Sequence, residues 1–209
     1  LHSVLYKFIH YFVHNFSEWK HLMDLSERSK LIIEILAKLP YEIGTFRADF
    51  VYDECKNPKI IEITCRFALS AQSLSNMYYQ IGKEKYNKNF NRMKCVDHLV
   101  KLPGYIAECS RSGDVFILKG KREDYESEAI VYKKILREAG RRIIEVHYNE
   151  LENYLSEMNE DSWIVSELTF EEIESIEIEL LLQLASLNLI NDFRTILLIH
   201  NKQFFSVLT

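Results

Sequence analysis

The first forty residues repeat their apolar side chains at the three- and four-residue spacing of amphipathic helices. One helix is predicted over residues 1–16, where Lys7 and three histidines interrupt the apolar run, so a packing helix fits better than a signal peptide or membrane anchor. Its apolar stripe consists of Leu5, Phe8, Ile9, Phe12 and Phe16. A second helix is predicted to begin at Asp24, with Glu27 three residues later as in a capping box, and to stop at Pro40.

The next stretch changes to the two-residue alternation of β-strands. Strands are predicted at residues 47–53 and 59–65, and the Asn57-Pro58 turn between them predicts an antiparallel hairpin. Successive side chains on a strand point to opposite faces, so one face of this hairpin is apolar and is expected to pack against the core. The residues expected to be buried there are Phe50, Ile61 and Ile63.

The opposite face of the hairpin gathers charged and polar side chains. They are Arg47, Asp49, Glu62 and Thr64, with Arg66 just beyond. Folding about the turn brings Asp49 opposite Glu62, and two converging carboxylates are costly unless a metal or an anion lies there. A metal site is one interpretation of this face, and a half-exposed hairpin with ordinary cross-strand ion pairs is the other.

From Gly113 onward, apolar strands alternate with amphipathic helices. The strands are predicted at residues 115–118, 143–147, 163–168 and 195–200. The helices are predicted at residues 124–139, where Gly140 ends the helix, at 149–158 and at 169–187. Capping boxes are expected to begin the last two helices, and they consist of Asn149 with Glu152 and of Thr169 with Glu172. This alternation predicts a parallel sheet with helices on both faces.

The predicted fold class is therefore α/β, divided into two domains. Residues 1–111 form an α+β part that contains the hairpin, and residues 112–209 form the parallel-sheet domain. The boundary is expected within Ser-Arg-Ser-Gly at 110–113, where the two patterns meet. Between the hairpin and this boundary, helices are predicted at 70–86 and 97–106.

Composition limits the classes of function. The chain of 209 residues can bury a sizeable core, and its net charge of −5 argues against nucleic-acid binding, which favours a basic surface. No apolar run reaches the length of a membrane span. Four cysteines lie at positions 55, 65, 95 and 109 without a C-x-x-C pair, so we expect reduced thiols in a cytoplasmic protein.

The polar face of the hairpin also follows a known motif. Arg47, Asp49 and Glu62, arranged as R-x-D with E-I-T thirteen residues after the Asp, resemble the magnesium-binding hairpin of the ATP-grasp ligases. The resemblance implies that Asp49 and Glu62, with Thr64 in place of the family's usual Asn, hold Mg²⁺ ions that bridge ATP phosphates. It also implies that Arg47 and Arg66 act in catalysis, with Arg47 facing the acyl-phosphate.

A second stretch, near the end of the chain, adds to this resemblance. Residues 191–208 run N-D-F-R-T-I-L-L-I-H-N-K-Q-F-F-S-V-L, which is similar to the end of the α/β domain in circularly permuted ATP-grasp proteins related to glutathionylspermidine synthase. His200 and Lys202 match positions of that stretch and are implied to bind the cofactor. The hairpin comes before the α/β domain, which is the order of the permuted family.

The function implied by the resemblance is that of an ATP-dependent ligase. It would activate a small-molecule carboxylate as an acyl-phosphate and join it to an amine, with ATP as co-substrate and Mg²⁺ as cofactor. Neither nucleic acid nor a membrane is an expected partner, and a homodimer stays open. The chain runs from Leu1 to Thr209, where it stops within the motif, so it is expected to be a fragment without the lid subdomain that grips ATP.

Two other classes of function stay open. Thr64 and the missing lid favour a non-catalytic scaffold or binding module of ATP-grasp descent. A flavodoxin-like or receiver-like domain with a helical extension is more distant, because the predicted strand at 115–118 is not followed by the aspartates that a receiver pocket needs.

Some polar residues also lie at the ends of predicted strands. Lys119, Lys121 and Arg122 follow the first strand of the parallel sheet, at the edge where open sheets bind ligands. A solvated loop is the simpler interpretation of these three. His200 closes the last predicted strand, and a packed or surface histidine is the simpler interpretation there.

Overall fold

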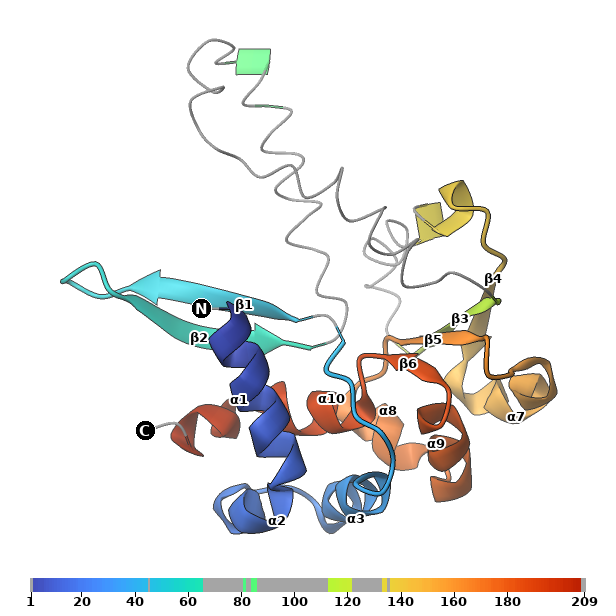
Figure 1. Cartoon of the computed structure of the whole chain (residues 1–209), viewed down its shortest axis with the longest axis horizontal. Helices are drawn as coiled ribbons and strands as arrows, with labels where there is room; N and C mark the ends of the chain where they lie inside the picture. The colour runs from blue at the N-terminus through green and yellow to red at the C-terminus, as the bar shows by residue number, and fades with distance from the viewer. Residues whose placement is uncertain are drawn as a thin grey trace.

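The computed structural model of the chain describes residues 2–44, 46–65, 81, 84–85, 113–121, 133–134 and 136–207. Its fold is a mixture of helices with an antiparallel hairpin and a four-stranded parallel sheet, so the predicted α/β class is confirmed. In Figure 1 the hairpin extends from one side of the molecule and the parallel sheet lies on the other, with helices from both ends of the chain between them.

The elements follow one another in this order. The N-terminal part contains α1 (His2–His14), α2 (Phe16–Trp19), η1 (Lys20–Leu22), α3 (Glu27–Leu36), β1 (Arg47–Tyr52) and β2 (Pro58–Thr64). The strands of the parallel sheet are β3 (Val115–Lys119), β4 (Ile143–His147), β5 (Trp163–Ser166) and β6 (Asn188–Ile190). The helices around the sheet are η3 (Tyr148–Glu150), α7 (Leu151–Tyr154), η4 (Leu155–Glu157), α8 (Phe170–Ser175), α9 (Ile178–Ala185), α10 (Phe193–Ile199) and η5 (Lys202–Val207).

The apolar stripe predicted for the first helix packs against the core, with Phe8 partly buried and the other four residues buried, so the prediction of a packing helix is confirmed. Ile9 and Phe12 of α1 are fully enclosed. The Phe12 ring packs edge to face against the ring of Phe204 in η5, and the two ring centroids lie 5.0 Å apart. This contact packs the first helix of the chain against the last described one.

The second helix begins later than predicted. Ser26, rather than Asp24, caps α3, because the Ser26 hydroxyl accepts a hydrogen bond from the Ser29 N–H at 2.9 Å. The N–H of Asp24 donates instead to the side chain of Gln203 at 2.8 Å. The predicted cap was therefore wrong by two residues.

The hairpin has the predicted pairing at its base. Asp49 lies opposite Glu62, and Ile63 is buried. Beyond Asp49 the register shifts through a β-bulge, so that Phe50 pairs with Ile60 and Ile61 becomes the extra residue.

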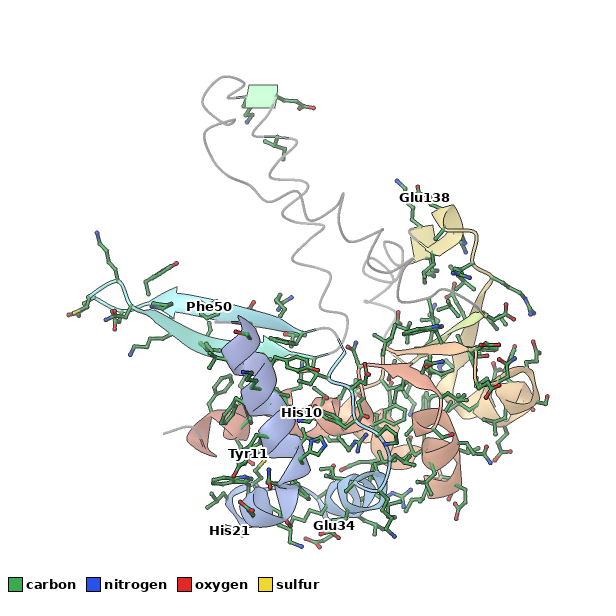
Figure 2. All side chains as sticks on the ribbon, viewed as in Figure 1. His10, Tyr11, His21, Glu34, Phe50 and Glu138 are labelled. Atoms are coloured by element: carbon green, nitrogen blue, oxygen red, sulfur yellow. The ribbon has the colours of Figure 1, made fainter. Side chains whose placement is uncertain are left out.

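The outer half of the hairpin does not pack as predicted. Phe50 is 37% exposed and Ile61 is 50% exposed, so the expectation that both are buried was wrong. The bulge breaks the alternation of faces, and Figures 1 and 2 show this half of the hairpin extending beyond the helices. The base of the hairpin therefore contributes Ile63 and Cys65 to the core, and beyond the bulge Ile60 is partly buried against it.

The parallel sheet has the strand order β4-β3-β5-β6. The chain passes from β3 to β4 on one side and then crosses back to β5 on the other. Right-handed crossovers place the connections after β4 and β5 on one face of the sheet. In agreement, α7, α8 and α9 contribute Leu151, Ile173 and Leu184 to the same core cluster as Phe116 of β3.

The last part of the sheet differs from the prediction. Residues 195–200, predicted as a strand, belong to α10, and the edge strand is β6, which was not predicted. A continuous apolar run fits a buried strand or a buried helix equally well, and all seven residues of α10 are buried. The helix predicted from 169 to 187 is divided into α8 and α9.

Of the three helix-end signals predicted after residue 113, two are confirmed. Thr169 and Glu172 form a capping box at α8, and Gly140 ends its helix with a left-handed backbone. The box predicted at Asn149 is wrong, because its side-chain oxygen accepts a hydrogen bond from the His147 ring at 2.8 Å. The Asn149 side chain therefore binds the last residue of β4 instead of capping a helix.

Several predictions lie mostly or wholly outside the described residues. These are the helices at 70–86 and 97–106, Arg66, and most of the boundary at 110–113. The described residues of the first of these helices, 81 and 84–85, are helical. The division into two domains stays a prediction. In the described part of the chain, no helix combines the length and apolar character needed to cross a membrane.

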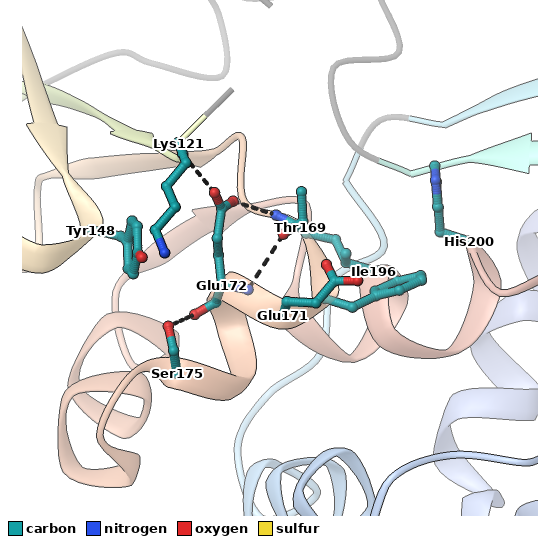
Figure 3. A pocket seen from close by; sticks show the side chains of 9 residues that line it. Lys121, Tyr148, Thr169, Glu171, Glu172, Ser175, Ile196 and His200 are labelled. Atoms are coloured by element: carbon teal, nitrogen blue, oxygen red, sulfur yellow. Dashed lines mark hydrogen bonds between the residues drawn. The ribbon is translucent and has the colours of Figure 1, made fainter. Parts of the chain in front are cut away.

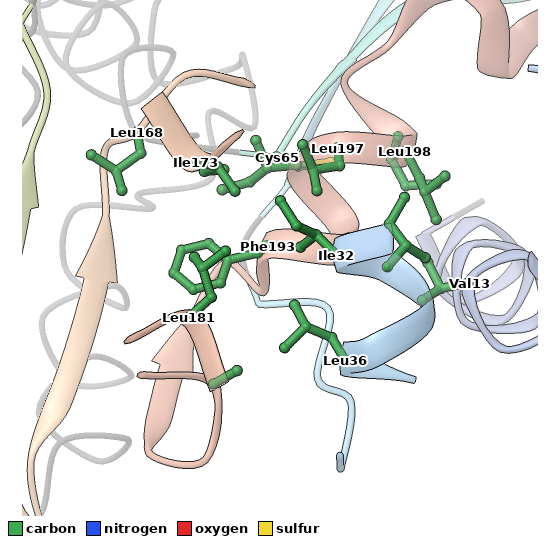
Figure 4. Packing of buried hydrophobic residues seen from close by; sticks show 14 of the residues in the cluster. Val13, Ile32, Leu36, Cys65, Leu168, Ile173, Leu181, Phe193, Leu197 and Leu198 are labelled. Atoms are coloured by element: carbon green, nitrogen blue, oxygen red, sulfur yellow. The ribbon is translucent and has the colours of Figure 1, made fainter. Parts of the chain in front are cut away.

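A single apolar cluster connects the N-terminal helices with the helices of the sheet. Figure 4 shows side chains of α3, α8, α9 and α10 meeting in it, together with Cys65 from the end of the hairpin. Burial of Cys65 raises the pKa of its thiol above the ordinary value, so the thiol stays protonated.

One buried ion pair fixes α10 against α3. The Arg194 guanidinium donates to both carboxylate oxygens of Asp192, at 2.9 and 2.6 Å. It also donates to the carbonyl oxygens of Leu36, Leu39 and Pro40, at 2.7, 3.1 and 2.5 Å. The arginine therefore binds carbonyl groups at the end of α3 and just beyond it.

Two further contacts complete this arrangement. The Arg194 guanidinium lies 4.8 Å from the ring centroid of Tyr41, and the Tyr41 hydroxyl shares a hydrogen bond of 2.7 Å with Thr195. Burial raises the pKa of Tyr41 far above its ordinary value, so the phenol stays neutral. Arg194 and Thr195, which belong to the quoted stretch 191–208, thus have a structural role.

Two histidines of α1 lie beside the Tyr41 ring. The rings of His10 and His14 stack with centroids 4.1 Å apart, and both rings lie within 5.6 Å of the Tyr41 ring. Burial, followed by the charge of His14, holds the pKa of His10 below its ordinary value. The folded chain therefore binds a proton at His10 less readily than the unfolded chain does.

We expect Arg194→Met to lower the free energy of unfolding by about 3–5 kcal/mol, because it leaves the Asp192 carboxylate buried without its cation. Urea denaturation measures this loss. Lys59→Met is the matched control, since Lys59 is 63% exposed, and it should change stability by less than about 0.5 kcal/mol. A loss below about 1 kcal/mol in Arg194→Met would show that the pair is not a structural anchor.

We expect stability to fall as the pH is lowered through about 6.5, the ordinary histidine pKa, because the unfolded state then binds more protons at His10. Urea denaturation between about pH 7.5 and 5 should show that the free energy of unfolding changes less with pH in His10→Asn than in the unmodified protein. His21→Asn, at the exposed position labelled in Figure 2, should keep the pH dependence of the unmodified protein. An equal pH dependence of stability in all three proteins would contradict the assignment of this effect to His10.

Candidate functional site

A pocket of about 490 Å³ opens at the carboxyl edge of the parallel sheet. Its lining residues are Lys121, Tyr148, Thr169, Phe170, Glu171, Glu172, Ser175, Ile196 and His200 (Figure 3). The loops after β3 and β5 both contribute to it. These strands are neighbours whose connections leave in opposite directions, and open parallel sheets bind ligands at such a point.

The carboxylate of Glu172 joins these two loops. One oxygen accepts a hydrogen bond from the Thr169 N–H at 2.9 Å, and the other accepts one from the Lys121 N–H at 2.5 Å. The N–H of Glu172 donates in return to the Thr169 hydroxyl at 3.3 Å. The dashed lines in Figure 3 follow these bonds, which fix the ends of β3 and β5 relative to each other.

The close approach of Glu172 requires a glycine at position 120. A Cβ atom added to Gly120 would lie 2.2 Å from a carboxylate oxygen of Glu172. That separation is far below a van der Waals contact, so any larger residue would displace the carboxylate. Gly120 and Glu172 therefore act together to shape the floor of the pocket.

Lys121 gives the pocket a positive charge. Its ammonium group lies 5.9 Å from the ring centroid of Tyr148. Within the described part of the chain it takes part in no ion pair. Glu171 adds an exposed carboxylate to the lining.

Lys119, two residues earlier, is already neutralised. Lys119 and Lys133 both pair with Glu145, at 2.9 and 2.7 Å. Burial raises the pKa of Glu145, but the hydrogen bonds and charges of the two lysines outweigh it, so the pKa lies below its ordinary value. The carboxylate stays charged, and Lys119 is less available to a ligand than Lys121.

The far wall of the pocket is apolar. The rings of Phe170 and His200 meet edge to face, with centroids 5.6 Å apart. Ile196, one turn before His200 on α10, is fully buried. In Figure 3 Lys121 and Tyr148 lie at one end of the pocket, and Ile196 and His200 at the other.

The residues predicted for the metal hairpin form a different arrangement. Both carboxylate oxygens of Asp49 accept hydrogen bonds from Arg47, at 2.8 and 2.9 Å, and Arg47 also donates to Thr64 at 3.3 Å. The guanidinium thus supplies the positive charge that a metal ion was expected to supply. In the described ranges, no three His, Cys, Asp or Glu side chains gather where they could share a metal ion.

The other predicted site residues are dispersed. Glu62 lies opposite Asp49 as predicted, whereas Arg66 lies outside the described residues. His200 lines the pocket, and Lys202 is exposed in η5. The structure therefore brings His200 together with Lys121, and not with the described residues of the hairpin.

Sequence reasoning missed most of the pocket walls. Tyr148 directly follows β4, and Phe170 and Glu171 follow the capping residue Thr169 after β5. The signal that could have found them is their position just beyond strand ends, where parallel sheets bind ligands. Using it requires the strand order, which the sequence does not contain.

A comparison with protein families identifies the chain. The family model described as the AnkG N-terminal domain matches residues 1–198, so the chain belongs to that family. No curated protein matches the chain.

The family match corrects the ATP-grasp resemblance. The predicted ligase function was wrong, as was the alternative of a scaffold of ATP-grasp descent, and ATP and magnesium binding lose the resemblance that implied them. The motif residues have other physical explanations: Arg47 neutralises Asp49, and Arg194 is buried against Asp192 and α3. The implied catalytic and cofactor roles of Arg47, Arg66, His200 and Lys202 lose their basis.

We expect Glu172→Ala to lower the free energy of unfolding by about 1–3 kcal/mol, because two backbone N–H groups lose their acceptor. Thermal and urea denaturation measure the loss. Glu152→Ala is the matched control: Glu152 occupies the corresponding position of the box that does not form, and its replacement should cost less than about 0.5 kcal/mol. Equal losses in both variants would contradict the role of Glu172 in joining the loops.

Proposed function

We propose that this member of the AnkG N-terminal domain family is a recognition domain that binds a small molecule in the pocket at the carboxyl edge of its sheet. The observation that carries the proposal is the coincidence of a pocket of about 490 Å³ with the point between β3 and β5 where the strand order reverses. Pockets for small ligands commonly enclose about 300–1,000 Å³.

The rigidity of the pocket supports binding. Its floor is fixed by the Glu172 carboxylate, and one wall belongs to α10, whose residues are buried along its whole length. A site that is already formed loses little conformational entropy when a ligand enters. Such a site therefore suits selective recognition.

The serine and threonine hydroxyl groups in the lining are used structurally, which confines the proposal to binding. The Thr169 hydroxyl accepts a hydrogen bond from the Glu172 N–H, and the Ser175 hydroxyl donates to the Glu172 carbonyl at 2.7 Å. A serine or threonine nucleophile would need a general base as its partner instead. We therefore propose recognition without assigning a reaction.

We also propose that the domain works in the cytoplasm. Cys55 is an exposed free thiol and Cys65 a buried one, and a reducing compartment maintains exposed thiols of this kind. Labelling of the thiols in intact cells with a thiol-reactive reagent tests this proposal. An oxidised Cys55 in freshly lysed cells would contradict it.

A pocket-filling substitution tests the site. Ser175→Trp places a large ring at the pocket from an exposed position of α8 and should abolish binding of ligands found by saturation-transfer NMR in a fragment library. Ser186→Trp is the matched control, because the Ser186 hydroxyl makes the same bond to the carbonyl three residues earlier, at 2.7 Å, away from this pocket. Ligands that bind both variants equally, or a library without any ligand, would overturn the proposal.

A further inference from the structure

We infer that the ligand of this pocket is a planar organic anion, whose acid group pairs with Lys121 and whose ring lies against the apolar wall. This inference rests on the proposed function and specifies the chemistry of its ligand. The residues that carry it are Lys121 and Tyr148 at one end of the pocket, and Ile196 and His200 at the other. Phe170 belongs to the second group through its ring contact with His200.

The charge of the ligand follows from the partners of the nearby ionic groups. The Glu172 carboxylate accepts two backbone hydrogen bonds, one to each oxygen, so its charge is directed to the loops. Lys119 is paired with Glu145. The ammonium group of Lys121 takes part in no ion pair among the described residues and lies over the Tyr148 ring in a cation–π interaction.

An acid group would complete the bonding of Lys121. An ammonium group has three N–H donors and no acceptor, and a tyrosine face satisfies none of them with a hydrogen bond to oxygen. A carboxylate or phosphate oxygen would accept charge-assisted hydrogen bonds from it. The Tyr148 ring holds the ammonium in place for such a partner.

The shape of the ligand follows from the opposite wall. The Phe170 and His200 rings lie at 76° to each other and are partly exposed, while Ile196, also in the lining, is fully buried. A flat ring buries apolar area efficiently against such a corner and loses little internal freedom on binding. A compound with an acid at one end and a ring at the other therefore matches both ends of the pocket.

Glu171 makes the inference testable in both directions. Its carboxylate lies in the lining and repels an anion but attracts a cation. Removing this charge should strengthen the binding of an anionic ligand and weaken the binding of a cationic one. Lys121 should behave in the opposite sense.

Three probes that share a naphthalene ring system but carry different head groups separate an anionic, a cationic and a neutral ligand. They are 1-naphthoate, 1-naphthylmethylamine and 1-naphthylmethanol. Titration calorimetry at low salt should give the tightest binding for 1-naphthoate. Lys121→Gln should weaken its binding about tenfold, the effect of one charge-assisted hydrogen bond. Glu171→Gln should strengthen it about two- to fivefold. Binding of 1-naphthylmethanol should stay nearly constant in both variants.

Lys134→Gln is the control for net charge, since Lys134 is 74% exposed and outside the pocket lining, and it should leave all three affinities unchanged. Tightest binding of the amine, an unchanged affinity of 1-naphthoate in Lys121→Gln, or no binding of 1-naphthoate would overturn the inference. The recognition proposal survives those results if fragment binding is still lost in Ser175→Trp and kept in Ser186→Trp. It falls if Ser175→Trp binds fragments as the unmodified protein does.

Discussion

The fold depends on a guanidinium group that is removed from water. Arg194 is almost fully buried, and a charge in that position is costly unless its hydrogen bonds are satisfied. The carboxylate of Asp192 and three carbonyl groups at the end of α3 and just beyond it satisfy them. Asp192 also accepts the N–H of Arg194 and thereby caps α10. One arginine therefore fixes the end of α3 against the beginning of α10. Both helices contribute side chains to the apolar core shown in Figure 4.

This anchor also positions the candidate site. The Asp192–Arg194 pair lies at the beginning of α10, and the same helix carries Ile196 and the following His200 to the wall of the pocket. On the other side of the pocket, Glu172 fixes the loops after β3 and β5 by accepting one N–H from each. Both devices are polar groups whose bonding is completed by backbone atoms, so the pocket walls rest on interactions with little freedom to rearrange.

The parts of the fold that were predicted correctly are those with local signals. The hairpin followed from alternation around Pro58, and the box at Thr169 from two residues in one turn of helix. The bulge that exposes Ile61 has no such signal, because it depends on which half of the hairpin meets the core. Likewise, residues 193–199 are apolar enough for a buried strand or a buried helix, and the bonds of Arg194 to the distant carbonyl groups of Leu36, Leu39 and Pro40 belong to the helical arrangement. Tertiary contacts, which a linear pattern does not contain, determined both.

The candidate site illustrates why short motifs mislead. In R-x-D on a strand, Arg47 and Asp49 lie on the same face, two residues apart, and can satisfy each other without a ligand. The same spacing thus fits a metal-binding hairpin and an ordinary ion pair, and the surroundings decide between them. Lys121 shows the opposite case: a solvated loop was the simpler interpretation of its local sequence, yet the strand order β4-β3-β5-β6 places it at the point where the sheet opens. The chemistry of this domain therefore follows from its topology more than from any run of residues.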